Sequence, residues 1–219
     1  MTPTIPDWIR DYRCPSGRFR NIYEYVPDET RLYGTESMFG DWDGELLILD
    51  QDFCCSDDIE RWIDEGRDRV FAHASELITN RSLELHTRGI DCGVVYGSAL
   101  AGMIKVGDSG SGLPGWSHMR SHLCDVLRFT IEHMPNLNAI ACMGSVAWEL
   151  CHDAFNAECL PISNAMMYHC PSKLDGLRVY AMPHPARGSA AIGSKESAQE
   201  RWEWLRTDLL GTDSVHAAA

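Results

Sequence analysis

The sequence predicts an α/β fold with three layers, α/β/α, around a central four-stranded parallel sheet. Short, continuous apolar runs alternate along the chain with longer stretches of helical periodicity. Such runs are typical of strands that are buried on both faces of a parallel sheet. Each run also ends in a polar or glycine-rich turn. The predicted strands are residues 46–49, 92–98, 139–143 and 177–182.

Stretches of helical periodicity lie between and after these strands. The first begins at Ser56, and its apolar residues continue at helical spacing to Thr79, with Gly66 as a point where the helix could divide. Asp57 and Glu60 have the spacing of a capping box at its start. Further helices are predicted at residues 116–134, 146–155 and 194–210.

Length and composition indicate one core with extensions. The chain has 219 residues, of which 44% are hydrophobic, enough for a full core. We expect residues 1–40 to form an N-terminal arm and pocket-covering segment, residues 41–210 the α/β/α domain, and residues 211–219 a disordered tail. No apolar run approaches a membrane span and no signal pattern appears, so we expect a cytoplasmic protein.

Charge and cysteine spacing exclude several function classes. The net charge of −13 argues against a generic polyanion binder, so any contact with nucleic acid would be local. The nine cysteines contain no Cys-x-x-Cys pair, the usual signature of a zinc ribbon or an iron–sulfur site. We therefore expect neither a metal nor a cofactor.

The turns after the four strands carry the polar residues of most interest. They are Gln51-Asp52, Gly97-Ser98, Gly144-Ser145 and His184-Pro185. Because the carboxyl ends of parallel strands lie along one edge of a sheet, these turns should face one crevice. Taken alone, the first turn also fits a helix-capping turn with solvated acids.

Together, the four turns resemble motifs of the uracil-DNA glycosylase superfamily. The stretch 49–54 resembles that superfamily's Leu-Gly-Gln-Asp-Pro-Tyr motif, and 93–98 resembles its Gly-Val-Leu-Leu-Leu-Asn strand. The stretch 143–147 resembles Trp-Gly-Ser-x-Ala, and 182–189 resembles Ala-Pro-His-Pro-Ser-Pro-Leu-Ser. The resemblance spans about residues 45–205, in the order of the family.

The resemblance implies hydrolysis of an N-glycosidic bond. Cleavage builds positive charge on the sugar and negative charge on the departing base. Asp52 would be the ionised carboxylate that positions water and stabilises the sugar cation, and His184 would donate a hydrogen bond to the base. Gln51, Phe53, Cys54 and Ser98 would line the base pocket, with Phe53 as the favoured stacking ring.

The resemblance also implies a set of DNA contacts. Gly144 and Ser145, at the start of a helix, would hold a phosphate through backbone N–H groups and the helix dipole. Arg187, Gly188 and Ser189 would enter the minor groove, with Arg187 as the wedge that helps to extrude the nucleotide.

Two base-pocket positions depart from the family. Ser98 stands where the family has the asparagine that reads the uracil edge, and a single hydroxyl cannot make that bidentate contact. Cys54 replaces the tyrosine that excludes the thymine methyl group. Both changes predict looser base selectivity.

The predicted function is thus a monofunctional DNA repair glycosylase that flips uracil out of DNA, with other deaminated bases as further candidate substrates. Its predicted partner is DNA containing uracil or another damaged base, without a membrane, and we expect a monomer. The alternatives are a non-catalytic DNA-binding protein of the same fold and an α/β enzyme that acts on free nucleotides, which the acidic charge would suit better.

Overall fold

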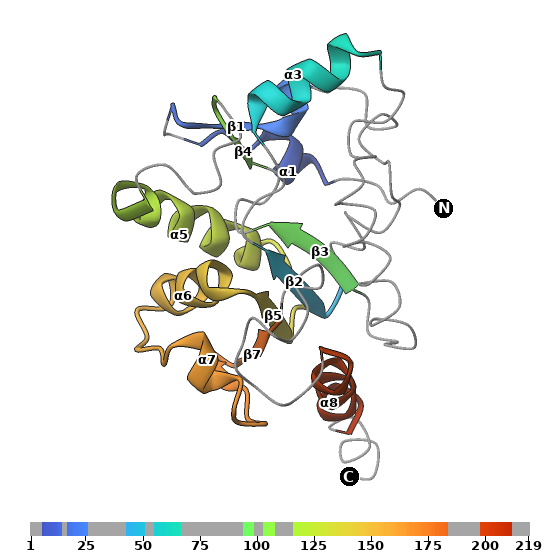
Figure 1. The fold of residues 1–219 in the computed structure, drawn as a ribbon, viewed down its shortest axis with the longest axis vertical. Helices are drawn as coiled ribbons and strands as arrows, with labels where there is room; N and C mark the ends of the chain where they lie inside the picture. The colour runs from blue at the N-terminus through green and yellow to red at the C-terminus, as the bar shows by residue number, and fades with distance from the viewer. Residues whose placement is uncertain are drawn as a thin grey trace.

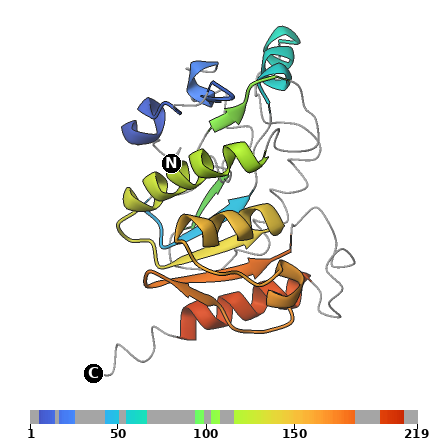
Figure 2. The same ribbon diagram turned by 90° about the vertical axis from the view of Figure 1, so that its left-hand side faces the viewer.

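The fold is described from a computed structural model of the chain. It describes residues 6–14, 17–25, 43–50, 55–66, 94–98, 103–107, 116–183 and 198–211. The fold is mixed α/β (Figures 1 and 2).

The main sheet has five strands in the order β3-β2-β5-β7-β6. The strands are β2 (Leu46–Asp50), β3 (Val94–Ser98), β5 (Ala139–Met143), β6 (Ser172–Leu174) and β7 (Leu177–Met182). All five residues of β2 and all five of β5 are buried, which is why residues 46–49 and 139–143 are continuous apolar runs. The four strands predicted from the sequence are confirmed, and they run parallel to one another.

The prediction of a four-stranded, wholly parallel sheet is wrong in one respect. A fifth strand, β6, pairs antiparallel with β7 as a hairpin. Its two-residue turn is Asp175-Gly176, and both residues have positive φ, 49° and 85°. An Asp-Gly pair favours this kind of turn because it tolerates positive φ at both positions. The hairpin therefore extends the edge of the sheet beside β7.

Two helices pack on opposite faces of the sheet. Cys142 in β5 contacts Cys151 in helix α6 (Ser145–Ala154). Tyr180 in β7 donates a hydrogen bond of 2.5 Å to Asp208 in helix α8 (Ala198–Gly211). Since Cys142 lies beside Ala181, and side chains alternate along a strand, Cys142 and Tyr180 point to opposite faces. Helix α5 (Trp116–Glu132) packs beside α6 (Figure 2).

Helix α3 (Ser56–Asp64) follows β2 and is shorter than the predicted helix. The helix ends at Asp64 with Glu65 as its C-cap residue, and Gly66 follows directly with φ of +69°, so the expected break there is confirmed. The predicted capping box is wrong. Cys55 is the N-cap residue, and the Ser56 hydroxyl accepts from the Gly107 amide at 2.9 Å. The predicted continuation to Thr79 lies outside the described residues.

A small second unit packs beside this sheet. It contains α1 (Asp7–Asp11), the antiparallel pair β1 (Phe19–Asn21) and β4 (Met103–Lys105), and the 3-10 helix η1 (Ile22–Glu24). The buried Asn21 side chain donates to the Ile9 carbonyl at 2.7 Å and accepts from the Tyr23 amide at 3.0 Å. Ile9, Phe19 and Ile22 are buried in the same core as the sheet. The described part of the predicted N-terminal arm is therefore integral to the core.

Helix α7 (Ile162–Ala165) lies in the segment between α6 and β6. No helix among the described residues is long and apolar enough to cross a membrane.

His152, in the last turn of α6, is a buried histidine with two hydrogen bonds. Its Nδ1 lies 2.9 Å from the Trp148 carbonyl oxygen, and because a carbonyl can only accept, Nδ1 carries the proton. Nε2 is then left to accept from the Ser172 hydroxyl at 3.3 Å. These bonds tie α6 to β6 through a neutral imidazole.

We expect this histidine to make stability depend on pH. Burial lowers the pKa of His152 from its ordinary value of 6.5, against smaller opposing effects of Trp148 and Asp153. The unfolded chain therefore takes up the proton first as the pH falls. The contribution of His152 to the free energy of unfolding should have its full value above about pH 6.5. It should decrease as the pH falls from there to the lower pKa that His152 has in the folded state. Urea denaturation of the wild type and of His152→Gln over this pH range measures the free energy of unfolding. The same dependence of that free energy on pH in both proteins would contradict the expectation.

Candidate functional site at the carboxyl edge of the sheet

The carboxyl ends of four neighbouring strands form one edge. Asp50, the last residue of β2, is paired with Ser98, the last residue of β3. Met143, the last residue of β5, is paired with Met182, the last residue of β7. The four turns predicted from the sequence therefore follow adjacent strand ends, and the four stretches that resemble glycosylase motifs each include one of these ends.

Three of the predicted site residues lie within the described part of the chain. Ser98 is described by its backbone at the end of β3, and Gly144 and Ser145 lie between β5 and α6. The others lie outside the described residues. They are Gln51, Asp52, Phe53, Cys54, His184, Arg187, Gly188 and Ser189.

The structure nevertheless describes the residues that directly precede two of these predicted site segments. Asp50, 8% exposed, precedes Gln51 directly, and the buried Pro183 precedes His184 directly. Strands β2 and β7 lie on either side of β5. With a spacing of about 4.8 Å between strands, their ends are roughly 10 Å apart. The segments that carry Asp52 and His184 thus start from two points separated by one strand.

The turn between β5 and α6 differs from the phosphate cradle predicted for it. The Gly144 amide donates to the Met182 carbonyl at 3.2 Å, so it is occupied within the sheet. In the part of the chain that the structure describes, the amides of Ser145 and Val146 have no acceptor, as is usual in the first turn of a helix. Ser145 is exposed. An anion at this turn would therefore meet Ser145 and Val146 rather than Gly144.

Gly144 has a conformation that only glycine adopts easily. Its φ is +88° and its ψ is 170°. A Cβ atom at this position would meet nothing within 4 Å, so the cost of a side chain would come from the backbone conformation alone.

Replacing Gly144 by alanine should destabilise the protein by about 1–3 kcal/mol because the turn requires this conformation. The matched control is Ser145→Ala, which removes an exposed side chain at the neighbouring position, the first residue of α6. That control should change stability by less than about 0.5 kcal/mol. Urea denaturation of both variants gives the comparison, and equal losses would show that the turn tolerates a side chain.

Sequence reasoning missed two buried cations near this edge. Lys105 is 6% exposed, and its backbone bridges to Cys55, three residues after Asp52. Arg201 in α8 is 1% exposed and contacts the end of β7. Lysine and arginine are rarely buried this fully, so periodicity gave no reason to expect either of them inside.

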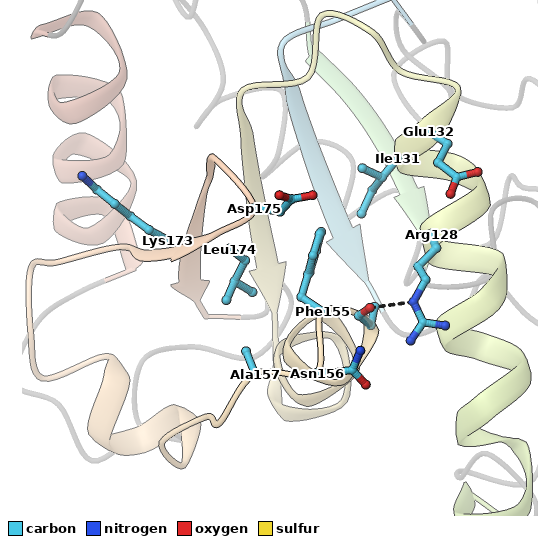
Figure 3. Close-up of a pocket in the computed structure, with 10 residues that line it drawn as sticks. Arg128, Ile131, Glu132, Phe155, Asn156, Ala157, Lys173, Leu174 and Asp175 are labelled. Carbon is cyan, nitrogen blue, oxygen red and sulfur yellow. Dashed lines mark hydrogen bonds between the residues drawn. The ribbon is translucent and has the colours of Figure 1, made fainter.

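A cavity of about 620 Å³ lies elsewhere in the molecule (Figure 3). It lies between the ends of α5 and α6 and the β6–β7 turn, which is at the amino end of the strands. The Arg128 Nε donates to the Ala154 carbonyl at 2.6 Å, closing the end of α6. The lining residues are Arg128, Ile131, Glu132, Ala154, Phe155, Asn156, Ala157, Lys173, Leu174 and Asp175. Of the predicted site residues that the structure describes, none lines this cavity.

Among the described residues, no group of three or more His, Cys, Asp or Glu side chains could hold a metal ion. No protein-family model matches this chain, and no curated protein matches it. The resemblance to the uracil-DNA glycosylase superfamily therefore stays a prediction, based on the four motif-like stretches of the sequence.

Proposed function

We propose that this protein is a DNA glycosylase that removes uracil from DNA, with other deaminated bases as further candidate substrates. One observation carries the proposal: the four motif-like stretches meet at the carboxyl ends of four adjacent strands. The stretch 93–98 ends there with β3, and the other three run from the last one or two residues of their strands into the turns. Sequence order alone does not require this, because a parallel sheet can place successive strands far apart. Shared position at this edge is what a common base-binding crevice needs.

In the proposed chemistry, positive charge develops on the sugar and negative charge on the departing base, and a different side chain stabilises each. Asp52, following β2, would be the ionised carboxylate that stabilises the sugar cation and orients water. His184, following β7, would donate a hydrogen bond to the departing base. The ends of β2 and β7, from which the two segments start, are roughly 10 Å apart, and this distance leaves room for one nucleotide between the segments.

The proposed DNA contacts are consistent with an acidic chain. Backbone amides at the start of α6 can hold a phosphate without a basic patch. Arg187, Gly188 and Ser189 would complete the contact in the minor groove. We further propose that the three-layer α/β/α arrangement extends over the whole sheet, and that the protein works as a cytoplasmic monomer. The packing of α6 and α8 on opposite faces supports the layered arrangement.

The test is cleavage of oligonucleotides by alkali after incubation with the purified protein. Substrates carry uracil, hypoxanthine or xanthine at one position, in single and double strands. We expect alkali-labile sites at uracil and none in the matched thymine oligonucleotide. The absence of breaks on every substrate would reject the proposal.

The same samples separate the alternatives. DNA binding without breaks would favour a non-catalytic DNA-binding protein. Neither binding nor breaks would favour an enzyme that acts on free nucleotides, which the net charge of −13 suits better.

A further inference from the structure

Arg201 is a buried arginine whose guanidinium group binds backbone carbonyls. Its Nε donates to the Ala181 carbonyl at 3.2 Å. One terminal nitrogen donates to the carbonyls of Met166 and Tyr168, at 3.1 Å each. The guanidinium carbon also lies 4.3 Å from the centre of the Trp204 ring. The rigid, planar fork of arginine can serve several acceptors at once, whereas a lysine ammonium is a compact point charge.

The Ala181 carbonyl belongs to a part of β7 that has no partner in β6. Ser172, the first residue of β6, is paired with Val179, so the last three residues of β7 extend beyond the edge strand. Arg201 binds β7 in this extension. On the other side of β7, the Gly144 amide donates to the Met182 carbonyl at 3.2 Å. The last two residues of β7 are therefore held from both sides, directly before Pro183.

The same guanidinium group fixes a second backbone segment beside this strand end. The carbonyls of Met166 and Tyr168 bracket Met167, and the Met167 and Tyr168 residues are 65% and 58% exposed. An exposed segment is thus tied to β7 through one buried side chain. Simple stabilisation does not require this arrangement, since a well-packed apolar residue often replaces a buried charge without loss.

We propose that Arg201 is a positioning residue that fixes the carboxyl end of β7, and with it the point from which the chain leaves the sheet towards His184. The inference rests on the proposed function for the role of His184. It adds a residue that touches neither the base nor the sugar. Small displacements of a catalytic group have large effects on rate, about 100-fold for a shift of 1 Å.

The test compares Arg201→Lys and Arg201→Met with a matched control, Tyr180→Phe. The control removes the hydrogen bond from Tyr180 to Asp208, which joins the same helix to the same strand between two side chains and holds no backbone carbonyl of β7. Stability, kcat and KM for uracil excision, and the NMR titration of the His184 ring are measured for each protein. The methionine side chain occupies the site without a buried unpaired charge, so Arg201→Met can replace Arg201→Lys in these measurements if the lysine variant folds poorly.

Both Arg201 variants should lower kcat by about 10- to 100-fold and change KM by less than about threefold. They should also shift the His184 titration and speed amide exchange at Ala181 and Met182. Tyr180→Phe should lower stability but keep kcat within about twofold. Arg201 variants with normal kcat and His184 titration would overturn the inference, as would an equal loss of kcat in the control.

The two proposals can fail separately. If the wild-type protein does not excise uracil, the proposed function fails, and Arg201 is then judged by His184 titration and amide exchange alone. Unchanged values in the Arg201 variants would reject the positioning role even if the wild type is active.

Discussion

Replacing Asp52 by asparagine should lower the rate of uracil excision by about 10²- to 10⁴-fold. Asparagine has nearly the same shape as aspartate but lacks the negative charge that would stabilise the sugar cation and orient water. Stability should change by less than about 0.5 kcal/mol if the side chain serves chemistry rather than packing. Single-turnover excision, followed by alkaline cleavage, measures the rate.

A second variant and a control sharpen this expectation. His184→Ala should also slow excision, because the departing base would lose its hydrogen-bond donor. Asp64→Asn makes the same charge change as Asp52→Asn at an exposed position in α3, and it should keep the rate within about twofold. An Asp52→Asn protein with the wild-type rate would remove Asp52 from the mechanism. Asp50, the other acid at this strand end, would then be tested next.

Replacing Trp148 by alanine should cost about 3–5 kcal/mol of stability, because it removes a large buried side chain and leaves a cavity. Trp148 lies in the first half of α6 and is 2% exposed. Its ring lies 4.1 Å from the His152 ring, measured between centroids, and its Nε1 donates to the Leu160 carbonyl at 2.8 Å. This side chain therefore fastens α6 to the segment that leads to α7.

The matched variant Trp148→Phe keeps most of the apolar contact and loses only the Nε1 donor and part of the ring. Because one hydrogen bond and part of the ring are lost while most of the cavity stays filled, the expected loss is only about 1–2 kcal/mol. Urea denaturation separates the two contributions. A loss below about 1 kcal/mol for Trp148→Ala would mean that the site collapses around the missing ring.

The strands could be predicted because their signal is local. The predicted strands 139–143 and 177–182 have the observed bounds of β5 and β7. The first is an uninterrupted apolar run before Gly144, and the second is apolar except for Arg178 and lies between Gly176 and Pro183. The helix predicted at residues 146–155 is observed as Ser145–Ala154, a shift of one residue at each end. End shifts of this size are common because helix ends fray.

The strands that were missed have weak local signals. β6, β1 and β4 have three residues each, too few for a periodic pattern. The Asp175-Gly176 turn was the available signal for the β6–β7 hairpin. β1 and β4 are far apart in the chain, so their pairing depends on tertiary contacts.

By itself, the sequence determined the four parallel strands, the polar turns at their carboxyl ends, and the residues in those turns that could perform chemistry. These properties follow from patterns within about ten residues. Only the tertiary structure decided the strand order and the occupation of the Gly144 amide by Met182. It also decided the burial of Arg201. This arginine of α8 binds the Ala181 carbonyl in the part of β7 that β6 does not pair with. Each of these features joins segments distant in sequence, and no local pattern encodes such contacts.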